Sequence, residues 1–308
     1  MSFHSLFNLN NKMMAALLNA GLDTLSAEQR AKLEIPILAA TVAELEAEKE
    51  KLKQNIEVLD FSHLHSFCFF IGYPRSGHSL IGSLLDAHEH MCIAHELNLF
   101  GLLSNTTLST KEIFQLILKN SKLFAAIKNV WGVYRYHVKG QHQGSFSKLK
   151  VIGDKKGGAS TQILAENPQL LSNLHNQLKL PIKIIHVVRN PFDNIATIHK
   201  KSHPSLAGAT KFYSSLCEAN EVLSSKLPSD IVLHVKHEKF LENPKQVLNE
   251  ICLFLNVEAT DDYLEACIAI LNSSPNRSRD SIIWPVEIKQ KINGLIQKYD
   301  YLSDYGFD

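Results

Sequence analysis

The chain lacks a charge excess, a long apolar run and a secretion signal. Its 308 residues carry 32 Lys and Arg against 31 Asp and Glu, so the formal net charge is +1. This balance gives no electrostatic reason to expect nucleic acid or an anionic membrane as a partner. The longest apolar runs, near residues 13–18 and 67–72, are far too short to cross a bilayer. No basic segment, apolar segment and cleavage site follow one another at the N-terminus, so we expect a cytoplasmic protein.

Cysteine and histidine are present, but without the spacing of a disulfide framework or a metal site. The five cysteines are odd in number and none stands in a CxxC motif. Most lie in apolar segments such as residues 67–71 and 251–255, as buried reduced thiols do. The 15 histidines form no HExxH motif and no Cys/His cluster. We therefore predict no metal site.

The first 58 residues differ from the rest of the chain because they read almost wholly as helix. Residues 43–53 (AELEAEKEKLK) mix acidic and basic side chains at the spacing of a solvated helix surface. Their apolar positions are too few for a long coiled coil. We expect a helical N-terminal extension over residues 1–58 that packs on the main domain, acts as a lid or forms a homodimer contact.

After the extension, short apolar strands alternate with amphipathic helices. Residues 67–71 are a continuous apolar run and Ile182–Val188 is rich in β-branched residues, as is typical of buried parallel strands. Residues 80–87 and 192–200, which follow these two runs, read as helices. The alternation predicts an α/β fold of the P-loop nucleotide-binding type over residues 59–308. Its sheet should be mostly parallel, with helices on both faces.

Residues 72–79 (GYPRSGHS) lie between the first strand and its helix. Backbone N–H groups of such a loop, together with the helix N-terminus, can hold a polyanion, and Gly72 and Gly77 permit the turn. The spacing is that of a Walker A loop, but His78 stands where that motif has the lysine that supports the β- and γ-phosphates. The cation here is Arg75, inside the loop.

The run GYPRSGHSLIGSLLDAH resembles the phosphosulfate loop of sulfotransferases that use PAPS, the 3′-phosphate of adenosine 5′-phosphosulfate. That loop is usually written PRSGTT or PKSGTT. The resemblance extends through most of residues 66–308 and points to the branch with bacterial and tyrosylprotein sulfotransferases. It implies PAPS as donor and PAP as product, and positioning and electrostatics suffice for such a transfer without a metal. It assigns the phosphosulfate to six loop residues: Pro74, Arg75, Ser76, Gly77, His78 and Ser79.

A second point of resemblance is the segment VVRNPFDNIAT. In the family, an arginine that ends a strand and a hydroxyl eight residues later bind the 3′-phosphate of PAPS; here these are Arg189 and Thr197, with threonine for the usual serine. Arginine can bind phosphate through two charge-assisted hydrogen bonds. The later segment NRSRDSIIW stands where related enzymes have a C-terminal cofactor loop, which makes Arg277 and Arg279 candidates for the same phosphate.

Four residues are candidates for the chemical step. The tyrosylprotein branch has a glutamate beyond the helix of the loop that acts as general base, and the same offset here reaches Glu96. His95 and His78 are alternative bases, and His78 also suits a wall of the sulfonate pocket. The triplet GDK ending at Lys155 matches a family motif whose lysine supports charge on the leaving phosphate, although Lys156 follows in place of the usual threonine.

These elements together predict transfer of a sulfuryl group from PAPS to a hydroxyl or amine of a small-molecule acceptor, an alkaloid natural product being one candidate. Residues 97–148, rich in Trp, Tyr and His, are expected to form an insertion that faces the acceptor. Two alternatives stay open: a P-loop kinase for a small molecule and a non-catalytic nucleotide-binding protein. The kinase needs Mg²⁺ and a loop lysine, and it has no use for a 3′-phosphate site.

Overall fold

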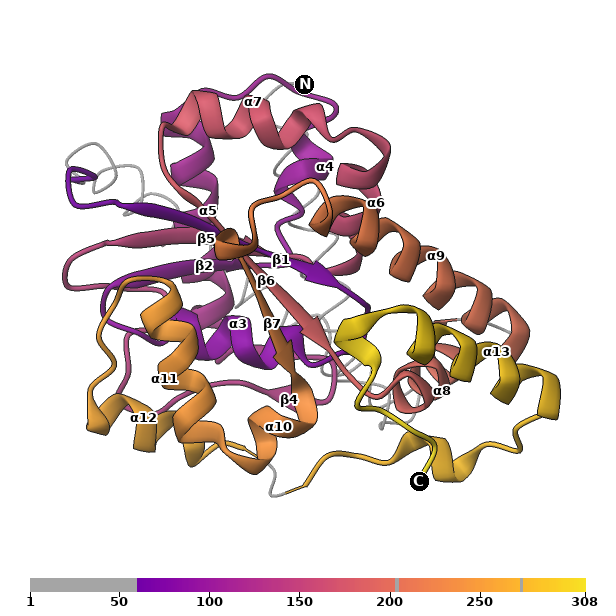
Figure 1. The fold of residues 1–308 in the computed structure, drawn as a ribbon. Helices are drawn as coiled ribbons and strands as arrows, with labels where there is room; N and C mark the ends of the chain where they lie inside the picture. Colours follow the sequence, from indigo (N-terminus) through magenta and orange to yellow (C-terminus); the bar gives the residue numbers. More distant parts are fainter. Residues whose placement is uncertain (1–59, 203–204, 272–273) are drawn as a thin grey trace, which may run out of the picture.

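The computed structural model describes residues 60–202, 205–271 and 274–308, and Figure 1 shows them as a central sheet covered by helices. The expected helical extension over residues 1–58 lies outside the described residues. No helix within them is both long and apolar enough to pass through a membrane. All five cysteines are buried and free. No group of three or more His, Cys, Asp or Glu side chains in the described ranges is arranged to hold a metal ion.

Five parallel strands form the central sheet, in the order β2-β5-β1-β6-β7. They are β1 (Ser66–Gly72), β2 (Met91–His95), β5 (Val151–Lys155), β6 (Ile182–Val188) and β7 (Val232–Lys236). In the register of the central strand, Phe67 lies opposite Ile152 of β5 and Ile182 of β6. The predicted α/β fold with a parallel sheet and helices on both faces is confirmed.

The apolar run of β1 is continuous because alternate side chains enter different cores. Phe69 joins the cluster under one group of helices, whereas Phe70 joins the cluster under the other. The first group contains α5 (Thr110–Ala126), α6 (Gly158–Glu166) and α7 (Gln169–Leu178); the second contains α3 (His78–Asp86), α11 (Pro244–Phe254) and α12 (Asp261–Ile268). Figure 1 shows the two groups on opposite sides of the sheet.

A third core lies beyond the end of β6 and ties the C-terminal part of the chain to the sheet. Phe192 and Trp284 meet edge to face in it, with ring centroids 5.3 Å apart, and Tyr73 stacks on Tyr213 at 4.4 Å. The elements that supply this core are α8 (Pro191–Ser202), α9 (Leu206–Ser224), α13 (Val286–Lys298) and the 3₁₀ turn η4 (Asp300–Leu302), with the turn η3 (Ser278–Ser281) against α8. Helix α10 (His237–Glu242) supplies Phe240 to the core of α3, α11 and α12, and the turn η2 (Ser229–Ile231) packs on the core of α5, α6 and α7.

Residues 97–148 contain two structurally different parts. The helices α4 (Leu99–Leu103) and α5 supply core residues such as Phe100 and Ile117. The strands β3 (Val130–Trp131) and β4 (Tyr134–Arg135) form a small antiparallel hairpin outside the main sheet. The hairpin, rather than the helices, is the part that reaches the cavity described next.

Candidate active site

A cavity of about 1160 Å³ opens at the carboxyl edge of the sheet. The chain leaves β1 toward β2 and β5 on one side and later toward β6 and β7 on the other, and α/β proteins bind ligands at such a reversal. Each strand supplies a lining residue at or beyond its C-terminus: Arg75, Glu96, Lys156, Arg189 and His237. The topology therefore gathers polar groups that are far apart in the sequence.

The loop after β1 is shaped by two glycines with left-handed backbones, Gly72 (φ 126°) and Gly77 (φ 99°). A Cβ at Gly72 would lie 2.7 Å from the carbonyl oxygen of Val187, and one at Gly77 would lie 2.3 Å from Nδ1 of His237. Helix α3 begins immediately after Gly77, and no side chain caps it. The first-turn N–H groups of a helix have no partner within the helix, so this end offers them to an anion.

Two side chains from the β6–α8 segment hold the carbonyl groups of the same loop. Asn194 Nδ2 donates to the carbonyl of Pro74 at 2.8 Å, and Arg189 Nη1 donates to the carbonyl of Arg75 at 3.3 Å. Arg75 has a left-handed backbone (φ 67°), and its exposed side chain lines the cavity. With the carbonyls bound from behind, negative dipoles are kept away from the anion site.

Glu96 lies between two lysines. Lys155 Nζ is 2.5 Å from Glu96 Oε1, and Lys156 Nζ is 2.6 Å from Oε2. His78 Nε2 is 3.7 Å from Oε1. Burial alone would raise the pKa of Glu96, but Lys155, the nearby imidazole of His78 and Lys156 outweigh it and hold the pKa well below its usual range. Glu96 is therefore ionised at neutral pH.

Lys155 is fully buried and connects Glu96 to the start of α3. Its Nζ donates to Ser79 Oγ at 3.0 Å. Its aliphatic stem packs on Gly82, where a Cβ would lie 2.7 Å from Lys155 Cγ. Burial lowers the pKa of Lys155, and the attraction of Glu96 opposes that shift. The side chain is thus fixed at both its stem and its head.

His78 forms part of the cavity wall beside this cluster. Its Nδ1 is 3.2 Å from Ser76 Oγ, and its ring packs on Gly157, where a Cβ would lie 3.0 Å from Cε1. Burial lowers the pKa of His78, although Glu96 acts in the opposite direction. A neutral imidazole at pH 7 follows.

His95, the alternative base, does not line the cavity. Its ring stacks on Phe124 at 3.8 Å between centroids and meets Trp131 edge-on at 4.8 Å. Burial lowers the pKa of His95 well below its usual value. The structure brings Glu96 and His78 to the cavity and leaves His95 in the core.

Asp154 was not predicted as a site residue, yet it fixes the backbone that carries Glu96. Asp154 Oδ1 accepts from the N–H of Leu97 at 3.2 Å, and Oδ2 accepts from the N–H of Leu99 at 2.8 Å. Glu96 has a left-handed backbone (φ 57°), which is uncommon for a residue with a side chain. These bonds hold the turn that directs Glu96 toward the lysines. Asp154 is the middle residue of the family motif GDK, and that motif was the feature of the sequence that could have identified it.

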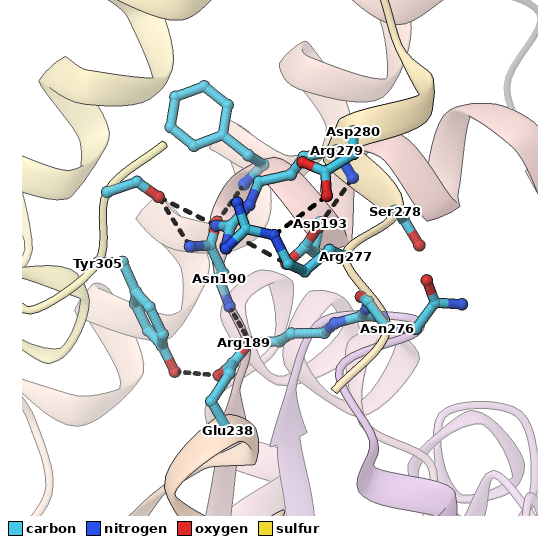
Figure 2. Close-up of polar contacts among 12 residues, drawn as sticks. Arg189, Asn190, Asp193, Glu238, Asn276, Arg277, Ser278, Arg279, Asp280 and Tyr305 are labelled. Atoms are coloured by element: carbon cyan, nitrogen blue, oxygen red, sulfur yellow. Dashed lines mark hydrogen bonds and ion pairs between the residues drawn. The ribbon is translucent and has the colours of Figure 1, made fainter. Parts of the chain in front are cut away.

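Arg189 lies at the other end of the cavity, beside the segment that carries Asn276 and Arg277 (Figure 2). Its Nη2 donates to the carbonyl of Asn276, and its buried Nε has no partner within residues 60–202, 205–271 and 274–308. No carboxylate of the described residues forms an ion pair with it. Thr197 Oγ1 lies nearby, 3.0 Å from Ser278 Oγ, and both hydroxyls line the cavity. A buried guanidinium without an anion is a site for one.

Arg277 and Arg279 have different environments although they are separated by one residue. Arg277 lines the cavity and binds Asp280 at 3.1 Å. Arg279 is 6% exposed; its N–H donates to Asp193 Oδ1 at 2.8 Å, and its Nη1 donates to the carbonyl of Gly306 at 3.2 Å. Arg279 therefore fixes the segment, whereas Arg277 faces the cavity.

Asn190, Glu238 and Tyr305 do not line the cavity, and they form a hydrogen-bonded clamp next to Arg189 (Figure 2). Asn190 donates through its N–H to Glu238 Oε1 at 2.9 Å and through Nδ2 to the carbonyl of Gly306 at 2.8 Å. Tyr305 donates to Glu238 Oε2 at 2.8 Å. The clamp joins three segments from the end of β6, the start of α10 and the C-terminal region. Its residues are far apart in the sequence, so no motif of fixed spacing predicts the clamp.

His237, which stands where the family has tyrosine, packs on Gly77 and lines the cavity between the α3 N-terminus and Arg189. Burial, and next the charge of Arg189, lower the pKa of His237 to about 4. Its Nδ1 is buried without a partner.

The chain is similar to known proteins in sequence and in fold. A sequence model described as the Sulfotransferase family matches residues 68–262, which is more than half of the 308-residue chain. No curated protein matches the chain. The solved sulfotransferase domain from the curacin biosynthetic pathway is 17% identical, and the match covers 80% of this chain and 100% of that domain (TM-score 0.49).

Two further solved structures are similar at the same low level. The sulfotransferase domain of the Synechococcus PCC 7002 olefin synthase is 18% identical, with coverage of 79% of this chain and 98% of that chain (TM-score 0.48). A mouse sulfotransferase complexed with PAP is 13% identical, with coverage of 83% and 94% (TM-score 0.45). By the family match over residues 68–262, the chain belongs to the sulfotransferase family and is a sulfotransferase enzyme.

Proposed function

We propose that the cavity binds PAPS and transfers its sulfuryl group to a hydroxyl or amine of a small-molecule acceptor. The observation that carries this proposal is that one cavity is lined by two groups suited to anions, the uncapped N-terminus of α3 and the guanidinium of Arg189, which has no carboxylate partner among the described residues. A nucleotide with anionic groups at both its 5′ and 3′ positions needs two such sites. ATP, which carries all its phosphates on one position, needs only the first.

The two anionic groups of PAPS bind at opposite ends of the cavity. The loop residues from Pro74 to Ser79 and the amides of α3 hold the phosphosulfate, and Arg75 adds a cation there. Arg189 and Thr197 hold the 3′-phosphate, with Arg277 beside them. Arg279 takes no part in binding, because its guanidinium is buried against Asp193 and Gly306.

The chemical step is an in-line displacement at sulfur. The acceptor oxygen or nitrogen forms a bond to sulfur while the bond from sulfur to the bridging oxygen breaks, and that electron pair stays on the 5′-phosphate of PAP. Glu96 takes the proton that the acceptor loses. Lys155, fixed between Glu96 and Ser79, supports the negative charge that develops on the leaving phosphate.

The acceptor binds between Glu96 and the β3–β4 hairpin. The hairpin lines the cavity with the rings of Trp131, Tyr134 and Tyr136, and with Arg135. Aromatic walls of this kind suit a planar acceptor. Alkaloid natural products are one class with that shape.

Calorimetric titration with PAP tests the nucleotide site. We expect saturable binding to the intact protein, and at least tenfold weaker binding of ATP, because a missing 3′-phosphate leaves the buried Arg189 unpaired. Incubation with PAPS and a metabolite panel, followed by mass spectrometry, then identifies the acceptor by its added sulfuryl group. Absence of PAP and PAPS binding, or Mg²⁺-dependent ATP turnover, contradicts the proposal.

A further inference from the structure

Lys156 stands where the family resemblance places a threonine, and the transfer step above makes no use of it. Its side chain is 27% exposed and lines the cavity. Its Nζ binds Glu96 Oε2 at 2.6 Å. It follows the last residue of β5 and precedes Gly157, whose left-handed backbone (φ 55°) turns the chain toward α6.

The adjacent Lys155 differs in its freedom to move. Lys155 has a side chain that is 1% exposed, and its head is held by both Glu96 and Ser79. Its stem is packed against Gly82, and it is absent from the cavity lining. Of the two lysines that bind Glu96, only Lys156 lines the cavity with a partly exposed side chain, so it can change partners. Lys155 acts on the leaving phosphate from its fixed position beside Ser79.

Glu96 needs to lose one of these lysines to act as a base. Each ammonium stabilises the carboxylate, and a carboxylate so stabilised is a weak acceptor for the proton of a hydroxyl or amine. The entering donor is a polyanion whose sulfuryl oxygens arrive at the N-terminus of α3, next to Ser79 and Glu96. The donor therefore offers Lys156 a new anionic partner close to Glu96. Transfer of Lys156 to that partner frees one oxygen of Glu96.

We propose that Lys156 is a further substrate-binding residue, which leaves Glu96 for a sulfuryl oxygen of PAPS when the donor binds. The inference rests on the proposed function of the cavity. The exchange has two effects: an ammonium neutralises the group in transfer, and Glu96 keeps one lysine partner, Lys155, in place of two and becomes a stronger base. Donor binding thereby prepares the base for the acceptor.

PAPS and PAP differ by the sulfuryl group, so their affinities isolate this contact. Calorimetric titration of Lys156→Gln should show PAPS affinity reduced by about tenfold, the effect of one charge-assisted hydrogen bond, with PAP affinity within about twofold of wild type. Lys156→Arg, which keeps the charge, should restore most of the preference for PAPS. Lys239→Gln, on the exposed surface of α10, is the matched control and should change neither affinity.

A crystal structure of the wild-type protein with PAPS gives a second readout that does not depend on a variant folding. Lys156 Nζ should lie within hydrogen-bond distance of a sulfuryl oxygen, with Lys155 still on Glu96. An unchanged ratio of PAPS to PAP affinity in Lys156→Gln, or Lys156 still bound to Glu96 in the complex, overturns the inference and leaves the sulfotransferase site intact. Failure of the wild-type protein to bind either nucleotide overturns both.

Discussion

The two ends of the cavity hold their positive charges in different ways. At the transfer end, Lys155 and Lys156 are already paired with a carboxylate, Glu96. At the nucleotide end, Arg189 is held by the carbonyl groups of Arg75 and Asn276, and its Nε has no partner among the residues that the structure describes. At the transfer end, a lysine must leave Glu96 before it can bind another anion. At the nucleotide end, Arg189 has no anionic partner to give up.

Because of this difference, we expect one end to determine the affinity for the donor and the other to determine the rate of sulfuryl transfer. An anion that reaches Arg189 forms an ion pair without breaking one, so this end should supply most of the binding free energy of the donor. An anion that reaches Lys156 must compete with Glu96, so the net gain in affinity is smaller. The competition has a use, because the outcome changes the basicity of Glu96. Substitutions at the two ends should therefore affect different measurements.

The largest effect is expected for Glu96→Gln. Loss of the carboxylate should reduce the rate of sulfuryl transfer by about 10²- to 10⁴-fold, since no base remains to accept the proton of the acceptor. PAP affinity should stay equal or rise, because Lys155 and Lys156 lose their anionic competitor. Turnover is followed by mass spectrometry with the acceptor found in the metabolite panel, and PAP binding by calorimetry.

Glu287→Gln, at an exposed position of α13, is the control for a general charge change. It should alter neither turnover nor PAP binding. Wild-type turnover in Glu96→Gln would show that the ion-paired carboxylate is not the base. In that case both ends of the cavity would serve to bind the donor, and neither would be assigned the base.

At the nucleotide end, Arg189→Ala should reduce PAP affinity by roughly 10- to 100-fold, because a charge-assisted contact to the 3′-phosphate is lost. Adenosine 5′-monophosphate lacks that phosphate, so its affinity should change little. Titration of both nucleotides into the wild type and the variant gives the comparison. An equal loss for both would mean that Arg189 only supports the loop carbonyl of Arg75 and does not bind phosphate.

The sequence predicted the sheet well where local pattern and burial agree. Strand β6 has the predicted bounds Ile182–Val188, because a β-branched run between proline signals suits only a strand buried on both faces. The β3–β4 hairpin was not predicted, since its strands of two residues each are too short to show alternation. The extension over residues 1–58 stays a prediction.

For the site, the sequence predicted which residues lie near the cavity more reliably than which of their side chains face it. Glu96 and His95 are neighbours, and only the left-handed turn at Glu96 (φ 57°) decides that the carboxylate meets the lysines while the imidazole stays in the core. Arg279 differs from Arg277 through its contacts to Asp193, which lies 86 residues earlier in the chain and which no local pattern reveals. The direction of Arg279 thus depends on a partner that is distant in the sequence.

The smallest effect concerns the clamp next to Arg189. Tyr305→Phe removes the hydroxyl that donates to Glu238 Oε2 at 2.8 Å, which should lower the free energy of unfolding by about 1 kcal/mol. Glu238 keeps its bond from the N–H of Asn190, so PAP affinity should fall only about two- to threefold through a looser Arg189. Urea unfolding and PAP titration measure the two effects, and Tyr134→Phe, on the hairpin at the transfer end, should show neither. A loss of PAP affinity as large as that of Arg189→Ala would mean that the nucleotide end is organised by the clamp rather than by the strand that carries Arg189.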